Sequence, residues 1–496
     1  MVSLPRFRFR LSCVLLAAVL GACGGDDDPA PPVDNGGGNG GDNGGNDGGG
    51  ATDQQPPQAT LTAPAALATG LTGDIALTAT ASDDVGVTAV EFEADGGPVG
   101  PPDTTAPSGA TVSVANHPPG QHIVRARARD ASGKVSAWSS ATVRFGGTAK
   151  VPAGFTLTES WVAGIARGTA MAQAPDGRLF IAQQGGDLRV VKDGALLPAP
   201  FASFTVDGNG ERGLIGVAVH PDFATNGWVF VHYTSPAGGA HGRIARLVAN
   251  GDVSDGSETV LVDLPVLSSA TNHNGGALHF GTDGKLYVAV GDNAQRTLAP
   301  RLDSVFGKLL RFNDDGTIPT DNPHAATQAG LARAIWAHGL RNPFTFAVQP
   351  VTGTLYVNDV GENTWEEINL VTAGANLGWP ATEGPTTEAG VTAPLFAYRQ
   401  TDTDPPGSGP GGFFTGQSIA GGAFYPASGG SFPAPYASNY FFADHVAKSV
   451  GRLDPANGNA ATSFARMAGN PVDVLAGNDG ALYVLSRNSL ARITVP

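Results

Sequence analysis

The sequence is poor in cysteine, in basic residues and in long apolar runs. Its 496 residues contain two cysteines, Cys13 and Cys23, and 29 Lys and Arg against 44 Asp and Glu. If a leader carrying Cys13 is removed, one cysteine remains and no intramolecular disulfide can form, so stability must come from core size or bound metal. The net charge of −15, without a Lys/Arg cluster, argues against nucleic acid as a partner. No apolar run approaches the roughly 20 residues of a membrane span.

The N-terminus has the pattern of an export signal. Three arginines precede an apolar run that ends in "LGAC", which resembles a bacterial lipobox. We therefore predict a lipoprotein signal peptide over residues 1–22 and lipidation of Cys23, with a plain signal peptide as the alternative. The protein is then exported and attached to the bacterial cell envelope, at the outer membrane and facing the periplasm or the cell exterior. Its contact with the membrane is through the lipid anchor only.

Two segments of different texture follow the signal. Residues 23–57 are almost entirely Gly, Asp, Asn, Pro and Gln, a composition that predicts a flexible tether. Residues 58–147 contain short alternating segments ended by Asp, Gly or Pro, which predict an antiparallel, immunoglobulin-like β-sandwich. Within them "SDDVGVTAVEFEADG" resembles bacterial immunoglobulin-like repeats of exported proteins. His117 and His122 are isolated in the sequence, and we expect both to be surface residues.

Residues 151–496 contain an internal repeat in which a turn precedes a short β-type run. At about 58 residues per unit, each repeat has room for four strands and their loops. The predicted fold class is therefore all-β, a six-bladed β-propeller preceded by the immunoglobulin-like β-sandwich; no pattern of eight amphipathic helices supports a TIM barrel. The six turns lie at Gly177, Gly227, Gly284, Gly353, Asn439 and Gly480.

Several motifs in this region are expected to meet at one mouth of the propeller, because loops at one end of a propeller converge on its central channel. They are "GERGLIGVAVHPDF", "NHNGG", "AHGLRNPFTFAV" and "NDVGENTWEEINLV", which is followed by "GANLGWP". The order of the motifs along the chain, with "GKLLRFNDDGTIPTDNP" among them, is specific. Together they resemble the soluble quinoprotein sugar dehydrogenases, which are the glucose/sorbosone dehydrogenase family that uses pyrroloquinoline quinone, and their hedgehog-interacting-protein-like relatives. The resemblance covers 151–496 and implies oxidation of an aldose.

The resemblance implies roles for four residues. His273 matches the general base that takes the proton of the sugar's anomeric hydroxyl while hydride passes to the quinone, and a histidine titrates in the range that this role needs. Arg341, as a catalytic and cofactor-binding residue, and Asn342 match the pair that meets the quinone oxygens. Ser418 supplies a hydroxyl where the family has threonine. From the residues alone, a structural histidine and a loop-fixing arginine remain alternatives.

The same resemblance implies two calcium sites. Gly361 and Glu362 align with positions whose backbone carbonyls hold the calcium that polarises the cofactor, and carbonyl oxygens suit a hard cation. Glu367 aligns with a carboxylate ligand of a second, structural calcium. The alternative for Glu367 is a salt-bridged turn glutamate.

The sequence also departs from the family pattern. Glu211 stands where cofactor-dependent members have glutamine, and with Asn272 it occupies the substrate-binding position beside the base. Asn470 and Val472 stand where the family has two quinone-binding arginines, and Val446 stands near its cofactor-binding lysine. These departures leave open whether pyrroloquinoline quinone binds.

Three functions follow from these patterns. The first is a cell-envelope quinoprotein sugar dehydrogenase that takes a small sugar substrate and passes electrons to an envelope acceptor. The second is a catalytically silent, calcium-stabilised propeller that binds a glycan or a protein. The third is a lactone-hydrolysing calcium propeller, for which Asp222, Asp292 and Asp359 are candidate ligands. The sequence does not indicate the sugar, the acceptor or the oligomeric state.

Overall fold

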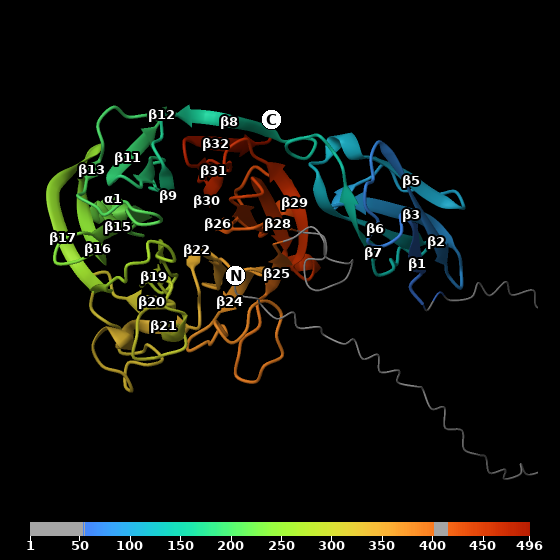
Figure 1. Cartoon of the computed structure of the whole chain (residues 1–496). Coiled ribbons are helices and arrows are strands. Elements are labelled where there is room, and N and C mark those ends of the chain that lie inside the picture. Colours follow the sequence, from blue (N-terminus) through green and yellow to red (C-terminus); the bar gives the residue numbers. More distant parts are fainter. Residues whose placement is uncertain (1–52, 54, 401–414) are drawn as a thin grey trace, which may run out of the picture. The chain divides into compact units, whose positions relative to one another are not determined.

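The computed structural model describes Asp53, residues 55–400 and residues 415–496 (Figure 1). The signal 1–22, Cys23 and nearly all of the tether 23–57 lie outside the described residues. As predicted, the described chain is all-β. Within it, no helix is long and apolar enough to cross a membrane. Its helical segments are α1 (Phe223–Asn226), η1 (Val114–Asn116), η2 (Arg296–Leu298), η3 (Gly330–Ala334), η4 (Ala434–Tyr436) and η5 (Pro455–Asn457).

The N-terminal domain is a sandwich of two antiparallel sheets. Alternating residues of its strands face a shared core that includes Val90, Phe92 and Val143. The first sheet has the order β1 (Gln58–Ala63), β2 (Asp74–Ser82), β5 (Ser108–Ser113). The second has the order β4 (Gly97–Pro98), β3 (Val87–Ala94), β6 (Gly120–Asp130), β7 (Ser139–Phe145).

The prediction that His117 and His122 are surface residues is wrong. His122 has 0% of its surface exposed, and His117 is half-buried. The reason lies in β6, where alternation breaks down and the residues from Gln121 to Val124 are all buried, so both faces of this strand segment are covered. A strand buried on both faces cannot be recognised from a period-two pattern.

Residues 156–494 form six further antiparallel sheets in the described part. Figure 1 shows them in chain order, from teal through green and orange to red. The first has the order β12 (Ala195–Leu196), β11 (Asp187–Lys192), β10 (Leu179–Gln183), β9 (Gly168–Gln173), with β13 (Ala202–Ser203) on β11. The next two are β14 (Leu214–Val219), β15 (Trp228–Ser235), β16 (His241–Asn250), β17 (Val253–Val266) and β18 (Gly275–Phe280), β19 (Leu286–Val290), β20 (Lys308–Phe312), β21 (Ile335–His338).

The remaining three sheets complete the domain. They are β22 (Pro343–Val348), β23 (Leu355–Asp359), β24 (Trp365–Val371), β25 (Phe396–Arg399); β26 (Ile419–Phe424), β27 (Tyr440–Asp444), β28 (Ser449–Asp454), β29 (Ala460–Arg466); and β30 (Pro471–Ala476), β31 (Leu482–Ser486), β32 (Ser489–Thr494), β8 (Thr156–Ala163). The last sheet thus joins the two ends of the domain, because β8 comes from its N-terminal side and β32 from its C-terminal side.

The first strands of these sheets contact one another in a ring. β9, β14, β18, β22, β26 and β30 each contact the next in this order, and β30 contacts β9. Glycines make the close approach possible: a side chain on Gly216 would collide with the carbonyl of Gly276 on the neighbouring inner strand. Sheets arranged in this way around a central axis constitute a β-propeller.

The ring has two mouths, which strand direction defines. At one, here called the repeat mouth, the inner strands end, and the six predicted turns lead there into β10, β15, β19, β23, β27 and β31. Glycines at five of these turns have φ between 65° and 91°, a region that disfavours other residues. At the other, here called the site mouth, the inner strands begin and the second strands end. Residues just before each first strand and just after each second strand therefore lie together at the site mouth.

Candidate functional site

His273 lies at the site mouth in the loop before β18, and its backbone is held in an unusual conformation. Its φ is 56°, which costs a non-glycine residue about 1 kcal/mol. The cost is offset by two contacts: its N–H donates to Glu211 Oε2 at 2.8 Å, and its carbonyl accepts from the Asn293 N–H at 3.0 Å. A residue fixed in a strained conformation at a channel mouth is typical of functional positions.

The His273 ring is oriented by a buried carboxylate. Its Nδ1 lies 2.8 Å from Oδ1 of Asp292, a residue that is 1% exposed and follows β19. Oδ2 of Asp292 accepts from the indole N–H of Trp379 at 2.9 Å. Since a carboxylate accepts, the proton of a neutral His273 ring belongs on Nδ1, and Nε2 keeps its lone pair. Among the described residues Nε2 has no hydrogen-bond partner, so the ring is arranged as a base.

Arg341 and Asn342 precede β22 and are held by one carboxylate. The backbone N–H groups of both donate to Asp359, at 2.9 and 2.7 Å. The Arg341 guanidinium donates to the Val360 carbonyl at 2.9 Å, and its buried Nε has no hydrogen-bond partner in the described structure. Burial raises the pKa of Asp359 to about 7, although the two N–H groups and the Arg341 charge oppose this shift.

The structure brings these residues into one network with His273, although 68 positions separate His273 from Arg341. The N–H of Asp292, the residue that orients the His273 ring, donates to the Arg341 carbonyl at 2.8 Å. Glu211 Oε2 accepts from both the His273 N–H and Asn342 Nδ2, the latter at 3.3 Å. Glu211 is therefore engaged in positioning the two loops. Asn272 is exposed, and its carbonyl accepts from Asn293 Nδ2.

The predicted calcium-binding residues lie in the connection after β23 and in β24. Glu362 is exposed and pairs with Arg296 at 2.8 Å. Glu367 is buried; its burial, the charge of Asp359 and the charge of Glu383 raise its pKa to about 8, although hydrogen bonds from Gly384 and Asn369 oppose this shift. Buried carboxylates that repel one another form an oxygen-rich environment of the kind that a hard cation stabilises.

Side-chain ligands alone do not make a calcium site here. In the described ranges, the groups of at least three His, Cys, Asp or Glu ligand atoms within 4.8 Å of one another are Asp95–His117–His122 and Asp53–Asp83–Asp84, both in the N-terminal domain. A calcium in the propeller therefore needs backbone carbonyls, as predicted for Gly361 and Glu362. Gly361 suits such a role, since any side chain there would collide with the Trp365 carbonyl.

A cavity of about 340 Å³ occupies the central channel. Of the predicted residues, Glu211, Asn342 and Ser418 line it, whereas His273, Arg341 and Asn272 do not. It is also lined by residues that sequence reasoning missed: Gln184, His445, Asp473 and Arg487. Three of these directly follow the second strand of a sheet (β10, β27 and β31), as Asp292 follows β19. Because each repeat turn leads into a second strand that ends at the site mouth, the residues after that strand could have been placed there from the sequence.

The cavity lacks the two arginines and the lysine that the family pattern places at or near Asn470, Val472 and Val446. Val472 lines it as an apolar residue, Val446 is 47% exposed elsewhere, and the Asn470 side chain donates to the His445 carbonyl. A different cation is present. Arg487 lines the wall, where its guanidinium donates to the Gly168 carbonyl and to Gln184 Oε1.

Arg487 has a cationic neighbour. Burial lowers its pKa, and the charge of Arg167 lowers it further. Two guanidiniums that repel each other in a partly dry site favour an anion between or beside them. Arg487 in the cavity wall, with Arg167 beside it, would hold a carboxylate of the cofactor, and in this respect the residues present fit pyrroloquinoline quinone.

The three aspartates proposed for a lactone-hydrolysing centre are not brought together. Asp222 precedes α1, after β14 has ended at the repeat mouth, whereas Asp292 and Asp359 lie at the site mouth. The structure therefore does not support that function. This alternative was open because the sequence alone does not indicate which mouth each loop occupies.

Comparisons with known proteins agree on a family. A family model described as glucose/sorbosone dehydrogenase matches residues 166–495, and one described as bacterial Ig domain matches residues 57–126. Aldose sugar dehydrogenase YliI of Escherichia coli (strain K12) is 33% identical over 64% of this chain and 87% of its own length. Quinoprotein glucose dehydrogenase B of Acinetobacter calcoaceticus is 30% identical over 43% of this chain and 50% of its own length. The solved apo-form of the soluble aldose sugar dehydrogenase from Escherichia coli is 28% identical, with a TM-score of 0.60 over 69% of this chain and all of that one.

Proposed function

The chain belongs to the glucose/sorbosone dehydrogenase family, and from this premise we propose that it oxidises an aldose at the anomeric carbon with pyrroloquinoline quinone as hydride acceptor. The observation that carries the proposal is the His273–Asp292 pair, joined through Asp292 and Glu211 to Arg341 and Asn342. The six sheets are then the blades of a six-bladed propeller, with the reaction at its site mouth.

Different residues of the protein have different roles in this reaction. His273 Nε2 accepts the proton of the anomeric hydroxyl, while Asp292 keeps the ring in the required tautomer and stabilises the imidazolium that forms. When bound, pyrroloquinoline quinone would supply the hydride acceptor for the anomeric carbon, and this oxidation would convert the sugar to a lactone. Arg487, with Arg167 beside it, would balance cofactor carboxylates, and the charge of Arg341 would stabilise negative charge that develops during reduction.

Two calcium ions support this arrangement in the proposal. The carbonyls of Gly361 and Glu362 would hold one, and Glu367 would contribute to a second. Burial and two neighbouring carboxylates give Glu367 a raised pKa, which a divalent cation would reverse.

The cellular setting is also a proposal. Lipidation of Cys23 anchors the protein to the cell envelope, facing the periplasm or the exterior, and the Gly-rich segment after it separates the folded domains from the membrane. An acceptor in the envelope would take up the electrons that the sugar loses.

One observation favours a silent binding propeller as the second candidate. Glu211 is occupied by two positioning hydrogen bonds, and the apolar Val472 lines the cavity where the family has an arginine. A propeller with this cavity could bind a glycan or protein without redox chemistry.

Reconstitution with calcium and pyrroloquinoline quinone separates the two candidates. A dye-linked assay across aldoses should show turnover with the full chain, and Arg487→Gln should weaken cofactor binding at least tenfold because it removes a cation from the cavity. Arg189→Gln is the matched control, because Arg189 lies in β11 and does not line the cavity. If pyrroloquinoline quinone does not bind in a stoichiometric amount, the result favours the silent propeller.

A further inference from the structure

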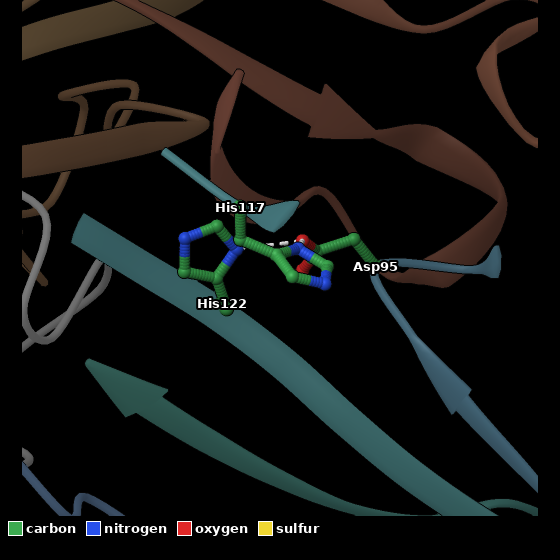
Figure 2. A group of neighbouring side chains, drawn as sticks. All are labelled: Asp95, His117 and His122. Carbon is green, nitrogen blue, oxygen red and sulfur yellow. Dashed lines mark hydrogen bonds and ion pairs between the residues drawn. The ribbon is translucent and has the colours of Figure 1, made fainter. Parts of the chain in front are cut away.

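Three side chains of the N-terminal sandwich converge on one point. Asp95 sits in the turn between β3 and β4, His117 follows η1, and His122 is in β6. Figure 2 shows both imidazole rings beside the carboxylate, and one ligand atom from each lies within 4.8 Å of the others. Asp95 and Gly96 have φ of 51° and 81°, the conformation of a two-residue hairpin turn in which Asp-Gly is favoured.

The contact of His122 Nε2 with a backbone carbonyl determines which ring nitrogen carries the proton. Its Nε2 lies 2.8 Å from the Pro118 carbonyl, which can only accept, so Nε2 carries a proton. In a neutral ring Nδ1 then has a lone pair, and this atom lies 2.6 Å from Asp95 Oδ2. A lone pair cannot face a carboxylate oxygen at that distance, so the two groups must either share a proton or bind a metal ion.

His117 supplies a second nitrogen for the same oxygen. Its Nδ1 lies 3.5 Å from Asp95 Oδ2, is itself buried, and forms no hydrogen bond in the described structure. A proton held between His122 and Asp95 leaves this nitrogen without a partner. A metal ion would bind both nitrogens and the oxygen together.

The surroundings hold these groups in the manner of ligands. Asp95 Oδ1 accepts from the Ile123 N–H at 2.9 Å, which leaves Oδ2 for the two rings. The His122 ring stacks on the buried Phe145 ring, with centroids 4.6 Å apart. The His117 ring meets the His122 ring edge-on, with centroids 5.2 Å apart. A backbone carbonyl on the far nitrogen and an apolar wall are the usual environment of a metal-bound histidine.

We propose that Asp95 Oδ2 and the Nδ1 atoms of His117 and His122 bind one divalent transition cation of the zinc class. At metal–ligand distances of about 2.0–2.1 Å, tetrahedral ligand atoms lie about 3.3 Å apart. The 3.5 Å separation of His117 from Asp95 already matches this value, and the 2.6 Å separation of His122 widens when the ion enters. Two imidazoles and one carboxylate suit zinc rather than calcium, and water completes the coordination.

The site would fasten the β3–β4 turn to β6 and to the loop before it. Cross-links of this kind replace disulfides where cysteine is absent, and the described residues contain no cysteine. The inference does not depend on the sugar dehydrogenase activity, because the ligands belong to the sandwich and not to the site mouth.

The test is a titration of the metal-stripped full chain with Co²⁺ and then Zn²⁺, in about 1 mM Ca²⁺ so that oxygen-rich sites are filled. We expect one equivalent of Co²⁺ to bind with the visible absorption of a low-symmetry site, to be displaced by Zn²⁺, and to raise the melting temperature. His117→Gln should weaken this binding at least a hundredfold. Because His117 is only half-buried, the metal-free variant should melt close to the metal-free parent.

His241→Gln is the matched control, since the His241 Nε2 lies 3.2 Å from Asp263 without a second histidine in that pair. It should bind Co²⁺ as the parent does. The proposal is overturned if the parent binds no Co²⁺ more tightly than about 100 µM, or if His117→Gln binds it as tightly as the parent. The first result would mean that His122 and Asp95 share a proton and bind no metal, and the second would mean that the ion binds without His117.

Discussion

Two histidine–aspartate pairs of this protein have the same contact at the ring Nδ1 and different surroundings at the ring Nε2. His273 in the propeller lies 2.8 Å from Asp292 through Nδ1, and His122 in the sandwich lies 2.6 Å from Asp95 through the same atom. In the described structure, His273 Nε2 has no partner, whereas His122 Nε2 donates to a carbonyl. The surroundings of Nε2 therefore decide the role of each ring. With that nitrogen open, the ring is a base, and with it bound to a carbonyl, the ring offers its other nitrogen to a cation.

The largest effect should come from removing the open nitrogen. His273→Gln should lower kcat for aldose oxidation on the order of 10⁴-fold, because it removes the proton acceptor and keeps the backbone contact to Glu211. A dye-linked assay of the reconstituted protein measures the loss, and a spectral titration should show unchanged cofactor affinity. Turnover at the parental rate would mean that another group is the base.

The same substitution in each pair sharpens the contrast. Asp292→Asn should lower kcat about a hundredfold, since an amide in place of the carboxylate no longer fixes the His273 tautomer or stabilises its charged form. Steady-state kinetics measures this effect. Equal loss of kcat in Asp95→Asn would show that the change is transmitted through the fold and is not local to the site.

Asp95→Asn should act on stability instead. Breaking a buried charged pair typically costs about 3–5 kcal/mol, and asparagine tolerates the positive φ at this turn, so the loss reports the pair itself. Urea denaturation of the metal-stripped chain measures the free energy of unfolding of the sandwich. Aldose oxidation by the reconstituted variant should remain at the parental rate under native conditions.

A third histidine, His232, has no carboxylate partner in the described structure, and its substitution should have the smallest effect on stability. His232 is buried, accepts no carboxylate contact, and its Nδ1 lies 3.2 Å from the Gly276 carbonyl. Burial lowers its pKa to about 4, against 6.5 for an unperturbed histidine. The unfolded state therefore binds more protons between these values, so the stability due to neutral His232 is present above pH 6.5 and is lost as the pH falls toward 4.

His232→Gln should remove this acid sensitivity. Between pH 7 and pH 5 the parent should lose about 2 kcal/mol more unfolding free energy than the variant. Denaturation at both pH values measures the difference. An identical acid dependence in the two proteins would mean that His232 is protonated in the folded state.

Much of the fold follows from the sequence because its signal is local. The glycine turns at Gly177, Gly227, Gly284, Gly353 and Gly480 require positive φ, and each introduces the second strand of a sheet. The loops carrying His273 and Arg341 could be placed at one mouth because both precede inner strands. Lipidation of Cys23 and the calcium ligands remain predictions.

The parts that the sequence did not reveal depend on distant contacts. Arg487 and His445 reach the cavity from connections whose composition is unremarkable. The sandwich cluster joins Asp95 to His117 and His122 across 22 and 27 positions, through a hairpin turn and a doubly buried strand. No fixed spacing links such residues, so only the three-dimensional arrangement identifies them.

The most direct test of the central claim is a single-turnover measurement on the full chain loaded with calcium and pyrroloquinoline quinone. Mixing with excess aldose in the absence of an electron acceptor should reduce the bound quinone, seen in its absorption spectrum, with formation of one lactone per protein. His273→Gln should bind the same quantity of quinone and leave it oxidised on that timescale. Quinone that binds stoichiometrically to the parent and is reduced by none of the aldoses would contradict the dehydrogenase assignment.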